Sequence, residues 1–469
     1  MLIQIQRKNS KNQKVSYPTG IIITLLMIAI IFFSTLPVHS ESIIAIRGGT
    51  VLTMTGQTIR NGIVLIRGEK IAAVGTDVKI PRGATIINAT GKYVLPGIID
   101  AMTYYGIKAF DLNDFTNTIT PQNRIIQAFY PFGDDFFRGK GGIRPDKEIL
   151  CGGVTTIYIA PGNRQVIGGQ GAVVKTYGKN FDSMVLREPA SIDMAIGDSP
   201  KIRRSVKFPY FSGSASQAER SILVSSPTRM AQAALIRKTL IRAQEFDHSL
   251  RAYNKKSEVE RKKVQKPKRD LNMEAMIKLL HKEIPARIEA SLVDDIRTAI
   301  RIADEFNFDL IIDSGVGAYK LRNLLAEKNI PVVLGPTSHP FIKGGGGSRT
   351  SELSQIMDEG NAAMLSEVGV KIAIASFASG GLFGDAVQGK WLLLEAGLAT
   401  GFGLPDEEAL KAVTINAAEI LGVNDRVGSL EPGKDADVII LDGPPLSIKT
   451  WVEHVFINGE LVYTREKSK

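Results

Sequence analysis

The sequence predicts a TIM-like (β/α)8 barrel with a small flanking β-sandwich domain built from both chain ends. Two observations carry this fold class. The middle of the chain alternates strand-like and helix-like segments, the pattern that gives parallel strands joined by helical crossovers. Both ends instead contain short β-rich stretches divided by Gly and Asn turns, without helical periodicity. The length of 469 residues, 44% of them hydrophobic, suffices for a barrel-sized core and a second small domain.

Residues 1–40 are predicted to be a signal peptide. Within them, residues 21–33 (IIITLLMIAIIFF) form an uncharged run after a leader with four basic residues and no acid. This run is shorter than the roughly 20 residues of a membrane span. Val38 and Ser40 are small enough to precede a cleavage site, so we expect an exported chain, periplasmic or secreted, that begins at Glu41. The alternative is an uncleaved anchor at residues 21–33, and membrane association is expected only in that case.

The charge of the chain does not indicate nucleic-acid binding. The formal net charge is +10, but beyond residue 40 there are 54 basic and 48 acidic residues. No basic stripe is interleaved with aromatic residues in the way that single-strand binders require. Cys151 is the single cysteine, which excludes an intrachain disulfide, and its place at the start of CGGVTTIYIA predicts a buried core position.

Residues 41–94 and 421–469 are predicted to form the composite β domain. The first range contains the stretches IIAIRGGTVLT and GIVLIRGEKIAAVG, and the second contains DADVIILDG and VEHVFINGELVYT. Because two distant segments share this texture, we expect one small sheet domain made from both. Residues 95–420 would then be inserted between them as the barrel.

Eight strand candidates follow one another along the middle of the chain, and eight is the number that closes a βα barrel. They begin near Val94, Val154, Ala172, Ser183, Ala286, Asp309, Pro331 and Val370. Between two of them, residues 292–306 place apolar side chains on one face at helical spacing, while Asp295, Arg297 and Asp304 fall elsewhere. This segment is predicted to be a helix packed on the barrel wall.

Two segments interrupt the alternation. Residues 196–285 are predicted to be a helical insertion that ends in the charged run NKKSEVERKKVQKPKRD. That run has too few apolar residues to pack, which favours a solvated helix end or loop; the alternative is contact with an acidic surface or partner. The segment KGGGGSRTSE, residues 343–352, predicts a rim loop and not a phosphate cradle, because no Lys-Ser/Thr pair follows at the required spacing.

From about Ile43 to Tyr463 the sequence resembles the amidohydrolase superfamily, in particular its imidazolonepropionase-like branch. The segments that carry the resemblance are, in order, GKYVLPGIID, GGVTTIYIAPG, GGQGAVVKT, EPASIDMAIGDSPK, ADEFNFDLII, IPVVLGP and LKAVTINAAEILGVNDRVGSLEPGKDADVIILD. The last is highly specific. The resemblance implies a hydrolase of C–N bonds in which imidazoles hold zinc or another divalent metal and an aspartate accepts a proton from the attacking water.

The positions at which the resemblance places these groups hold other residues. The paired histidines after the first strand fall on Met102 and Tyr104, those of the fifth strand on Glu289 and Ser291, that of the sixth on Ser314, and the aspartate on Phe377. Thioether sulfur is a poor ligand for zinc in water, and a phenyl ring accepts no proton. Oxygen atoms at four of these positions could suit magnesium or calcium, but Glu289 alone carries charge. We therefore predict no catalytic residue, no bound metal and no cofactor.

Four further residues are predicted to face the pocket: Lys175, Glu188, Arg287 and His339. His339 is the one histidine placed to approach the barrel mouth, and an ordinary loop position is its alternative. Glu289 is expected to pair with Lys175 or Arg287, or to be protonated near neutral pH, because burying an unpaired carboxylate costs several kcal/mol. Asp313 is expected to face the helices, because side chains alternate along a strand.

The predicted function is that of an exported, non-catalytic pseudoenzyme or partner subunit, which associates with an intact amidohydrolase relative or with itself. One alternative is an active hydrolase of carbon–nitrogen bonds other than peptide bonds, with a rebuilt site. Another is a small-molecule or peptide binding protein that uses the old pocket. The sequence contains no G-x-S-x-G motif, so a serine hydrolase is not indicated.

Overall fold

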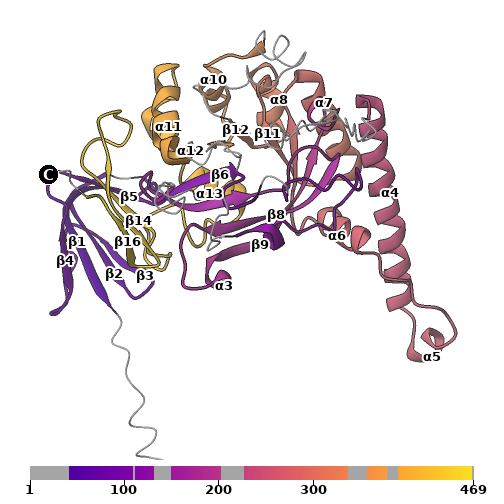
Figure 1. Ribbon diagram of the computed structural model, residues 1–469, viewed down its shortest axis with the longest axis horizontal. Helices are drawn as coiled ribbons and strands as arrows, with labels where there is room; N and C mark the ends of the chain where they lie inside the picture. The colour runs from indigo at the N-terminus through magenta and orange to yellow at the C-terminus, as the bar shows by residue number, and fades with distance from the viewer. Residues whose placement is uncertain are drawn as a thin grey trace, which may run out of the picture. The chain divides into compact units, whose positions relative to one another are not determined.

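The computed structural model describes residues 42–56, 58–108, 111–130, 149–201, 227–335, 356–377 and 389–466. Within this range Ile43–Lys469 forms one compact unit (Figure 1). The predicted signal peptide, His339 and the glycine-rich segment at 343–352 lie outside the described residues. Across the residues that are described, no helix combines the length and the apolarity needed to cross a bilayer.

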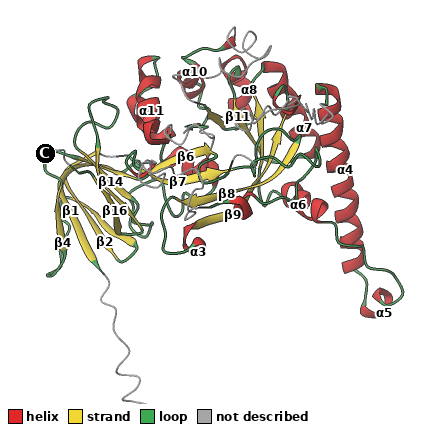
Figure 2. Ribbon diagram, in the orientation of Figure 1, coloured by secondary structure: helices red, strands yellow, loops and turns green. Residues whose placement is uncertain are grey.

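The flanking β domain is an eight-stranded sheet made from both chain ends, as predicted (Figure 2). Its strands are β1 (Ile43–Leu52), β2 (Thr58–Arg67), β3 (Lys70–Gly75), β4 (Thr85–Asn88), β5 (Tyr93–Pro96), β14 (Val438–Leu441), β15 (Val452–Ile457) and β16 (Glu460–Thr464). The order is β16-β15-β14-β5-β1-β2-β3, and β4 also pairs with β1. The antiparallel pairing of β14 with β5 joins the two ends of the chain.

The barrel consists of a second eight-stranded sheet whose neighbours follow chain order. Its strands are β6 (Ile98–Thr103), β7 (Val154–Ile159), β8 (Ile167–Lys175), β9 (Val185–Ala195), β10 (Ala286–Ala290), β11 (Leu310–Ser314), β12 (Val332–Leu334) and β13 (Ile372–Ile374). Hydrogen bonds bring the end of β13 to β6: the Phe377 N–H donates to the Met102 carbonyl at 2.9 Å, and the Ser376 N–H donates to Asp100 at 3.0 Å. The predicted TIM-like barrel is thereby confirmed.

One strand departs from the predicted all-parallel arrangement. β8 is antiparallel to both β7 and β9. The connection from β7 to β8 spans residues 160–166 without a helix, and antiparallel neighbours can be joined this way, whereas parallel strands need a crossover. Because Lys175 ends β8 and pairs with Thr156 near the start of β7, it lies at the amino end of the neighbouring parallel strands.

Helices cover the outside of the barrel (Figures 1 and 2). The α-helices are α3 (Phe181–Met184), α4 (Arg229–Asn254), α5 (Glu258–Arg261), α6 (Leu271–Leu280), α7 (Val293–Phe306), α8 (Arg322–Glu327), α10 (Asn361–Glu367), α11 (Leu392–Gly401), α12 (Asp406–Ala412) and α13 (Ile415–Leu421). Short 3-10 helices lie at η1 (Ile125–Ala128), η2 (Ser199–Lys201), η3 (Ala318–Leu321) and η6 (Gly389–Trp391). Helices α4 to α6 fall between β9 and β10, where the insertion was predicted.

Asp295 of α7 is buried, because the first turn of α7 meets Arg229 of α4, whose guanidinium donates to Asp295 at 2.7 and 3.0 Å. One local expectation was wrong. Cys151 is partly exposed, because it lies in the turn before β7, and the buried strand begins only at Val154.

The barrel interior is filled at its amino end. Ile99 of β6, Val333 of β12 and Ala373 of β13 share an apolar cluster with side chains of α13. The Ile99 N–H also donates to the Val413 carbonyl, just before α13, at 2.9 Å. The space for a site therefore lies at the opposite end, at the carboxyl ends of the parallel strands.

Candidate functional site

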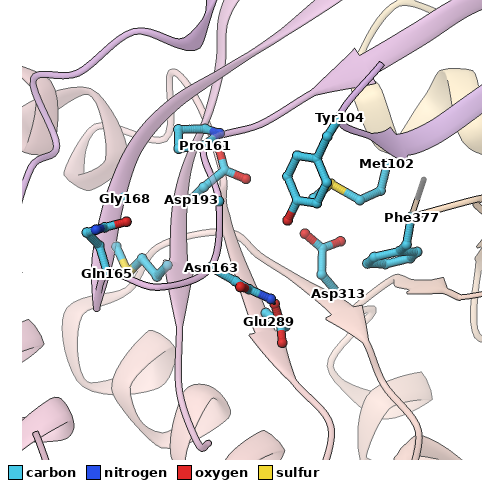
Figure 3. Close-up of a pocket in the computed structure, with 12 residues that line it drawn as sticks. Met102, Tyr104, Pro161, Asn163, Gln165, Gly168, Asp193, Glu289, Asp313 and Phe377 are labelled. Atoms are coloured by element: carbon cyan, nitrogen blue, oxygen red, sulfur yellow. The ribbon is translucent and has the colours of Figure 1, made fainter. Parts of the chain in front are cut away.

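A pocket lies at the carboxyl end of the barrel, where TIM-barrel proteins place their active sites (Figure 3). The lining residues are Met102, Tyr104, Pro161, Gly162, Asn163, Gln165, Gly168, Asp193, Met194, Glu289, Asp313 and Phe377. Four of the six positions predicted for the former metal site are among them: Met102, Tyr104, Glu289 and Phe377. In Figure 3 the Tyr104 hydroxyl and the Asp313 carboxylate face the same space, beside Met102 and Phe377.

The other two predicted positions, Ser291 and Ser314, lie beside each other at the ends of β10 and β11. Their hydroxyl oxygens are 2.9 Å apart. Ser314 has a φ of 72°, so the strand ends there in a left-handed conformation. The structure therefore brings these two residues together, but next to the pocket and not in its lining.

Asp313 lines the pocket, so the prediction that it faces the helices was wrong. In the parallel pairing of β10 with β11, Asp313 stands in register with Glu289. Residues in register project to the same side of a sheet, so an inward Glu289 requires an inward Asp313. The alternation argument failed because it assumed an inward Ser314 in extended backbone, whereas Ser314 has left the strand conformation.

Arg287 is the central cation of the barrel interior. Its guanidinium donates to Asp313 at 2.7 and 3.0 Å and to the Ala101 carbonyl at 2.9 Å, and it stacks 3.8 Å above the Tyr158 ring. Burial lowers the pKa of Arg287, but the attraction of Asp313 and the neighbouring groups outweighs burial and raises it overall. The guanidinium therefore stays charged, and its partner is Asp313 and not Glu289 as predicted.

Asp193 of β9 is a pocket residue that the sequence reasoning missed. The Tyr158 hydroxyl donates to its carboxylate at 2.7 Å, and the Ser191 hydroxyl donates at 3.0 Å. Burial raises the pKa of Asp193 to about 7, although Arg287 and these hydrogen bonds act in the opposite direction. The sequence SIDMA did carry a signal, since Ser191 and Asp193 are polar residues two apart in a strand and so share a face.

Two neutral side chains bind the Glu289 carboxylate. The side chains of Asn163 and Ser199 each donate a hydrogen bond to one of its carboxylate oxygens. The prediction that Lys175 would pair with it was wrong, because Lys175 lies at the other end of the barrel. There its buried ammonium forms ion pairs with Asp435 at 2.8 Å and Asp437 at 2.9 Å, next to the β domain.

Glu188 also lies away from the pocket. It was expected near the end of its strand, but β9 starts at Val185, so Glu188 lies close to the strand's beginning. Its carboxylate accepts two hydrogen bonds from Arg124, at 2.7 and 2.5 Å. The histidines that the structure describes are also elsewhere: His248 in α4, His281 at the end of α6, and His454 in β15.

The donor set of the pocket does not fit a zinc-like ion. Burial, followed by the negative charges of Glu289 and Asp193, raises the pKa of Tyr104, so its hydroxyl stays protonated. Met102 offers a thioether, which suits soft copper better than zinc, and Asp313 is occupied by Arg287. Within the described ranges, no three His, Cys, Asp or Glu side chains are grouped so as to hold a metal.

Phe377 stands at the position where the resemblance expects an aspartate. Its backbone conformation is unusual for a bulky residue. Its φ is 49°, in the left-handed region. Asp and Asn adopt this region more readily than a bulky residue does. The backbone at this position therefore has a conformation that Asp adopts more readily than Phe, and the side chain that lines the pocket is an aromatic ring.

Comparisons with known proteins agree with this architecture. The model of the amidohydrolase family matches residues 350–462. The crystal structure of an amidohydrolase from Thermotoga maritima is 31% identical, with a TM-score of 0.73, over 90% of this chain and 100% of that chain.

This chain matches only part of the length of two curated relatives. An amidohydrolase of Hapsidospora irregularis, tasK, is 23% identical over 85% of this chain, which spans only 39% of that protein. The imidazolonepropionase of Thermoplasma volcanium is 47% identical over 68 residues, 13% of this chain and 17% of the enzyme. Since the Thermotoga maritima protein is matched over its whole length at this identity, the chain belongs to the amidohydrolase family.

Proposed function

We propose that this chain is an exported amidohydrolase-fold protein that has lost hydrolytic chemistry and acts through binding, as a partner of an intact amidohydrolase relative or of itself. The observation that carries the proposal is the composition of the pocket. Where the family resemblance places imidazoles and a proton acceptor, the pocket presents Met102, Tyr104, Glu289 and Phe377. These side chains neither match zinc nor include a base at the position of Phe377.

The pattern of charge supports the same proposal. In a zinc enzyme the metal supplies positive charge to the pocket carboxylates. In this chain the Arg287 guanidinium supplies positive charge to Asp313, through two hydrogen bonds. A second cation at this place would meet a carboxylate that is already paired, and would be repelled by the neighbouring guanidinium.

The proposed partner role has its own test. Co-purification of this protein from its native host with an intact amidohydrolase, at a fixed ratio, would support partnership. A chain that elutes alone and as a monomer would contradict it.

The direct test combines metal analysis with activity. The mature protein, purified without chelators and dialysed with or without zinc, should hold well below one transition metal per chain. It should hydrolyse cyclic amides and amino-acid amides no faster than buffer does. About one metal per chain retained through gel filtration, together with turnover, would overturn the proposal.

A second candidate is a metal-independent hydrolase of carbon–nitrogen bonds, which one observation favours. Asp193 faces the pocket with a pKa raised by burial to about 7, the range in which a carboxyl group can exchange protons at neutral pH. If hydrolysis is detected in metal-free protein, Asp193→Asn should abolish it. Asp100→Asn is the matched control, because Asp100 is equally buried but bonds Ser376 outside the pocket.

Export has its own measurement. N-terminal sequencing of the protein from its native host should give a chain that starts at Glu41. An intact Met1 on membrane-bound material would instead support an anchor at residues 21–33.

A further inference from the structure

The insertion between β9 and β10 carries a charged projection that the pocket does not explain. Helix α4 extends past the barrel and has α5 at its far end (Figures 1 and 2). The last buried residue of α4 is Ala243, and no residue from 244 to 270 is buried. The part of α4 beyond Ala243 is about 16 Å long at the rise of an α-helix. Packing stabilises most helices in proteins, and this part of α4 receives little of it.

The charge of the protein is concentrated at this projection. We define the basic tip as residues 251–269, which contain nine basic and two acidic residues. Subtracting these from the 54 basic and 48 acidic residues beyond residue 40 leaves 45 and 46. The net positive charge of the exported chain therefore resides in the basic tip, and the remainder is close to neutral.

The lysines of the basic tip are available to a partner. They are Lys255, Lys256, Lys262, Lys263, Lys266 and Lys268. Five are exposed and Lys256 is partly exposed. In the part of the chain that the structure describes, no carboxylate lies within ion-pair distance of any of the six, whereas Arg251 and Arg269 at the borders are bound to Asp247 and Glu274.

Two apolar side chains accompany the lysines. Val259 in α5 is 66% exposed and Val264 is 40% exposed. Lysine around exposed aliphatic groups is the composition of segments that rest on a lipid surface, where ammonium groups meet phosphates and apolar groups enter the interface. Tyr253, the tip's one aromatic residue, lies under the Arg261 guanidinium, so no open platform for stacking bases is present at the tip.

We propose that the basic tip is a docking surface for an anionic lipid membrane. Lysine acts as a point charge without fixed geometry, which suits a diffuse layer of phosphates better than bidentate recognition of one acidic peptide. The proposal goes beyond the loss of hydrolysis and does not depend on it. It would bring the protein to a membrane surface whether or not residues 21–33 are removed.

A fluorescent label at the tip tests the proposal on the full chain. The chain carries Cys151→Ser and Val259→Cys, labelled with an environment-sensitive dye. Vesicles with roughly one third phosphatidylglycerol should shift the emission to the blue, phosphatidylcholine vesicles should not, and added salt should weaken the effect. The same dye at Ile448→Cys, which is 78% exposed on the β14–β15 loop, should not respond. Because the dye reports contact at the tip itself, the readout holds even if the N-terminal segment anchors the chain.

A pair of charge variants makes the test specific. Lys255, Lys256, Lys262 and Lys263 changed to Gln should raise the lipid concentration for half-maximal response at least about tenfold, since each lysine near an anionic surface contributes to binding. The matched control changes four other exposed lysines to Gln, namely Lys79, Lys179, Lys238 and Lys449, and should shift it less than about twofold.

Three results would overturn the proposal. The first is an equal response to neutral and anionic vesicles, and the second is an equal effect of the two lysine sets. The third is a response to polyglutamate or single-stranded DNA but not to anionic vesicles, which would assign the basic tip to an acidic protein or to nucleic acid.

Discussion

At the scale of single residues, Arg287 decides the electrostatics of the barrel interior. Its side chain is 1% exposed, and its guanidinium forms an ion pair with Asp313, whose side chain is 6% exposed. Removing one partner of such a buried pair leaves an uncompensated charge, which costs about 3–5 kcal/mol. Arg287→Met should therefore lower the free energy of unfolding by about this amount in urea titrations.

A matched variant separates burial from the loss of an ion pair. Arg124→Ala breaks the pair with Glu188, but the Arg124 side chain is 48% exposed, so the cost should stay below about 1 kcal/mol. Arg287→Met combined with Asp313→Leu should recover much of the lost stability, because both buried charges are then gone. Equal costs for Arg287→Met and Arg124→Ala would contradict this account of the interior.

Asp193 gives a prediction for pH. Because burial raises its pKa from 3.8 to about 7, the folded protein keeps a proton that the unfolded chain has released in this interval. The contribution of Asp193 to the unfolding free energy is fully present below about pH 4 and is lost as the pH rises through about 7. A pKa shift of this size corresponds to roughly 4 kcal/mol of unfolding free energy. Asp193→Asn should reduce the decline in unfolding free energy between about pH 4 and pH 8. Part of the decline below about pH 6 should remain, because burial also raises the pKa of Asp100 to about 6.

The control for this measurement is Asp114→Asn. The Thr116 hydrogen bond lowers the pKa of Asp114, so that group titrates below the interval and its variant should keep the wild-type decline. A wild-type decline that persists unchanged in Asp193→Asn would show that another group controls it.

The same residues show what the sequence can and cannot predict about the site. Met102, Tyr104, Glu289 and Phe377 line the same pocket, and the order of the motifs indicates which strand ends carry them. Their role as former metal-ligand and base positions stays a prediction. Asp313 was missed because its direction depends on the register with β10 and on the left-handed backbone of Ser314. Neither register nor a single φ value can be deduced from alternation along one strand.

At the scale of elements, the direction of β8 has the largest consequence. An apolar run of residues indicates a strand but not the direction in which the strand lies in the sheet. The sequence therefore predicted the strand but not that it is antiparallel to its neighbours. The short connection after β7 was the available signal, because it leaves no room for a crossover helix. The reversed direction carries Lys175 away from the pocket to Asp435 and Asp437.

This placement predicts a structural role for Lys175. Its side chain is fully buried, so Lys175→Met should leave the Asp437 carboxylate without its ammonium partner, while Asp435 keeps Lys70 and Arg426. We expect the loss to cost about 3–5 kcal/mol in unfolding free energy. Lys70→Met is the control, since Lys70 binds the same Asp435 but its side chain is 52% exposed, and it should cost less than about 1 kcal/mol. A negligible effect of Lys175→Met on the free energy of unfolding would argue against a structural role for its ion pairs with Asp435 and Asp437.

At the scale of the whole molecule, the fold was predictable because its signals are long. The C-terminal segment of the resemblance, the eight strand candidates and the two β-rich ends each extend over tens of residues, so errors at single positions do not change the result. The site depends instead on side chains from four separate strands that meet at one end of the barrel. Its chemistry is therefore a property of the assembled barrel.

The proposed loss of metal chemistry should for that reason resist repair at one position. A catalytic zinc needs about three protein ligands and an open position for water. Met102→His supplies one imidazole on β6, while Tyr104 stays protonated, Asp313 stays paired with Arg287, and Phe377 accepts no proton. We expect this variant to retain well below one zinc per chain through gel filtration and to hydrolyse amides no faster than buffer does.

Met102→His combined with Tyr104→His is the comparison, because two imidazoles and Glu289 approach the required three ligands. Adding Arg287→Met to this double variant should raise its zinc content further, because Asp313 is then released from its ion pair. Stoichiometric zinc in Met102→His alone would mean that the described pocket already holds most of a metal site, which would contradict the proposed pseudoenzyme.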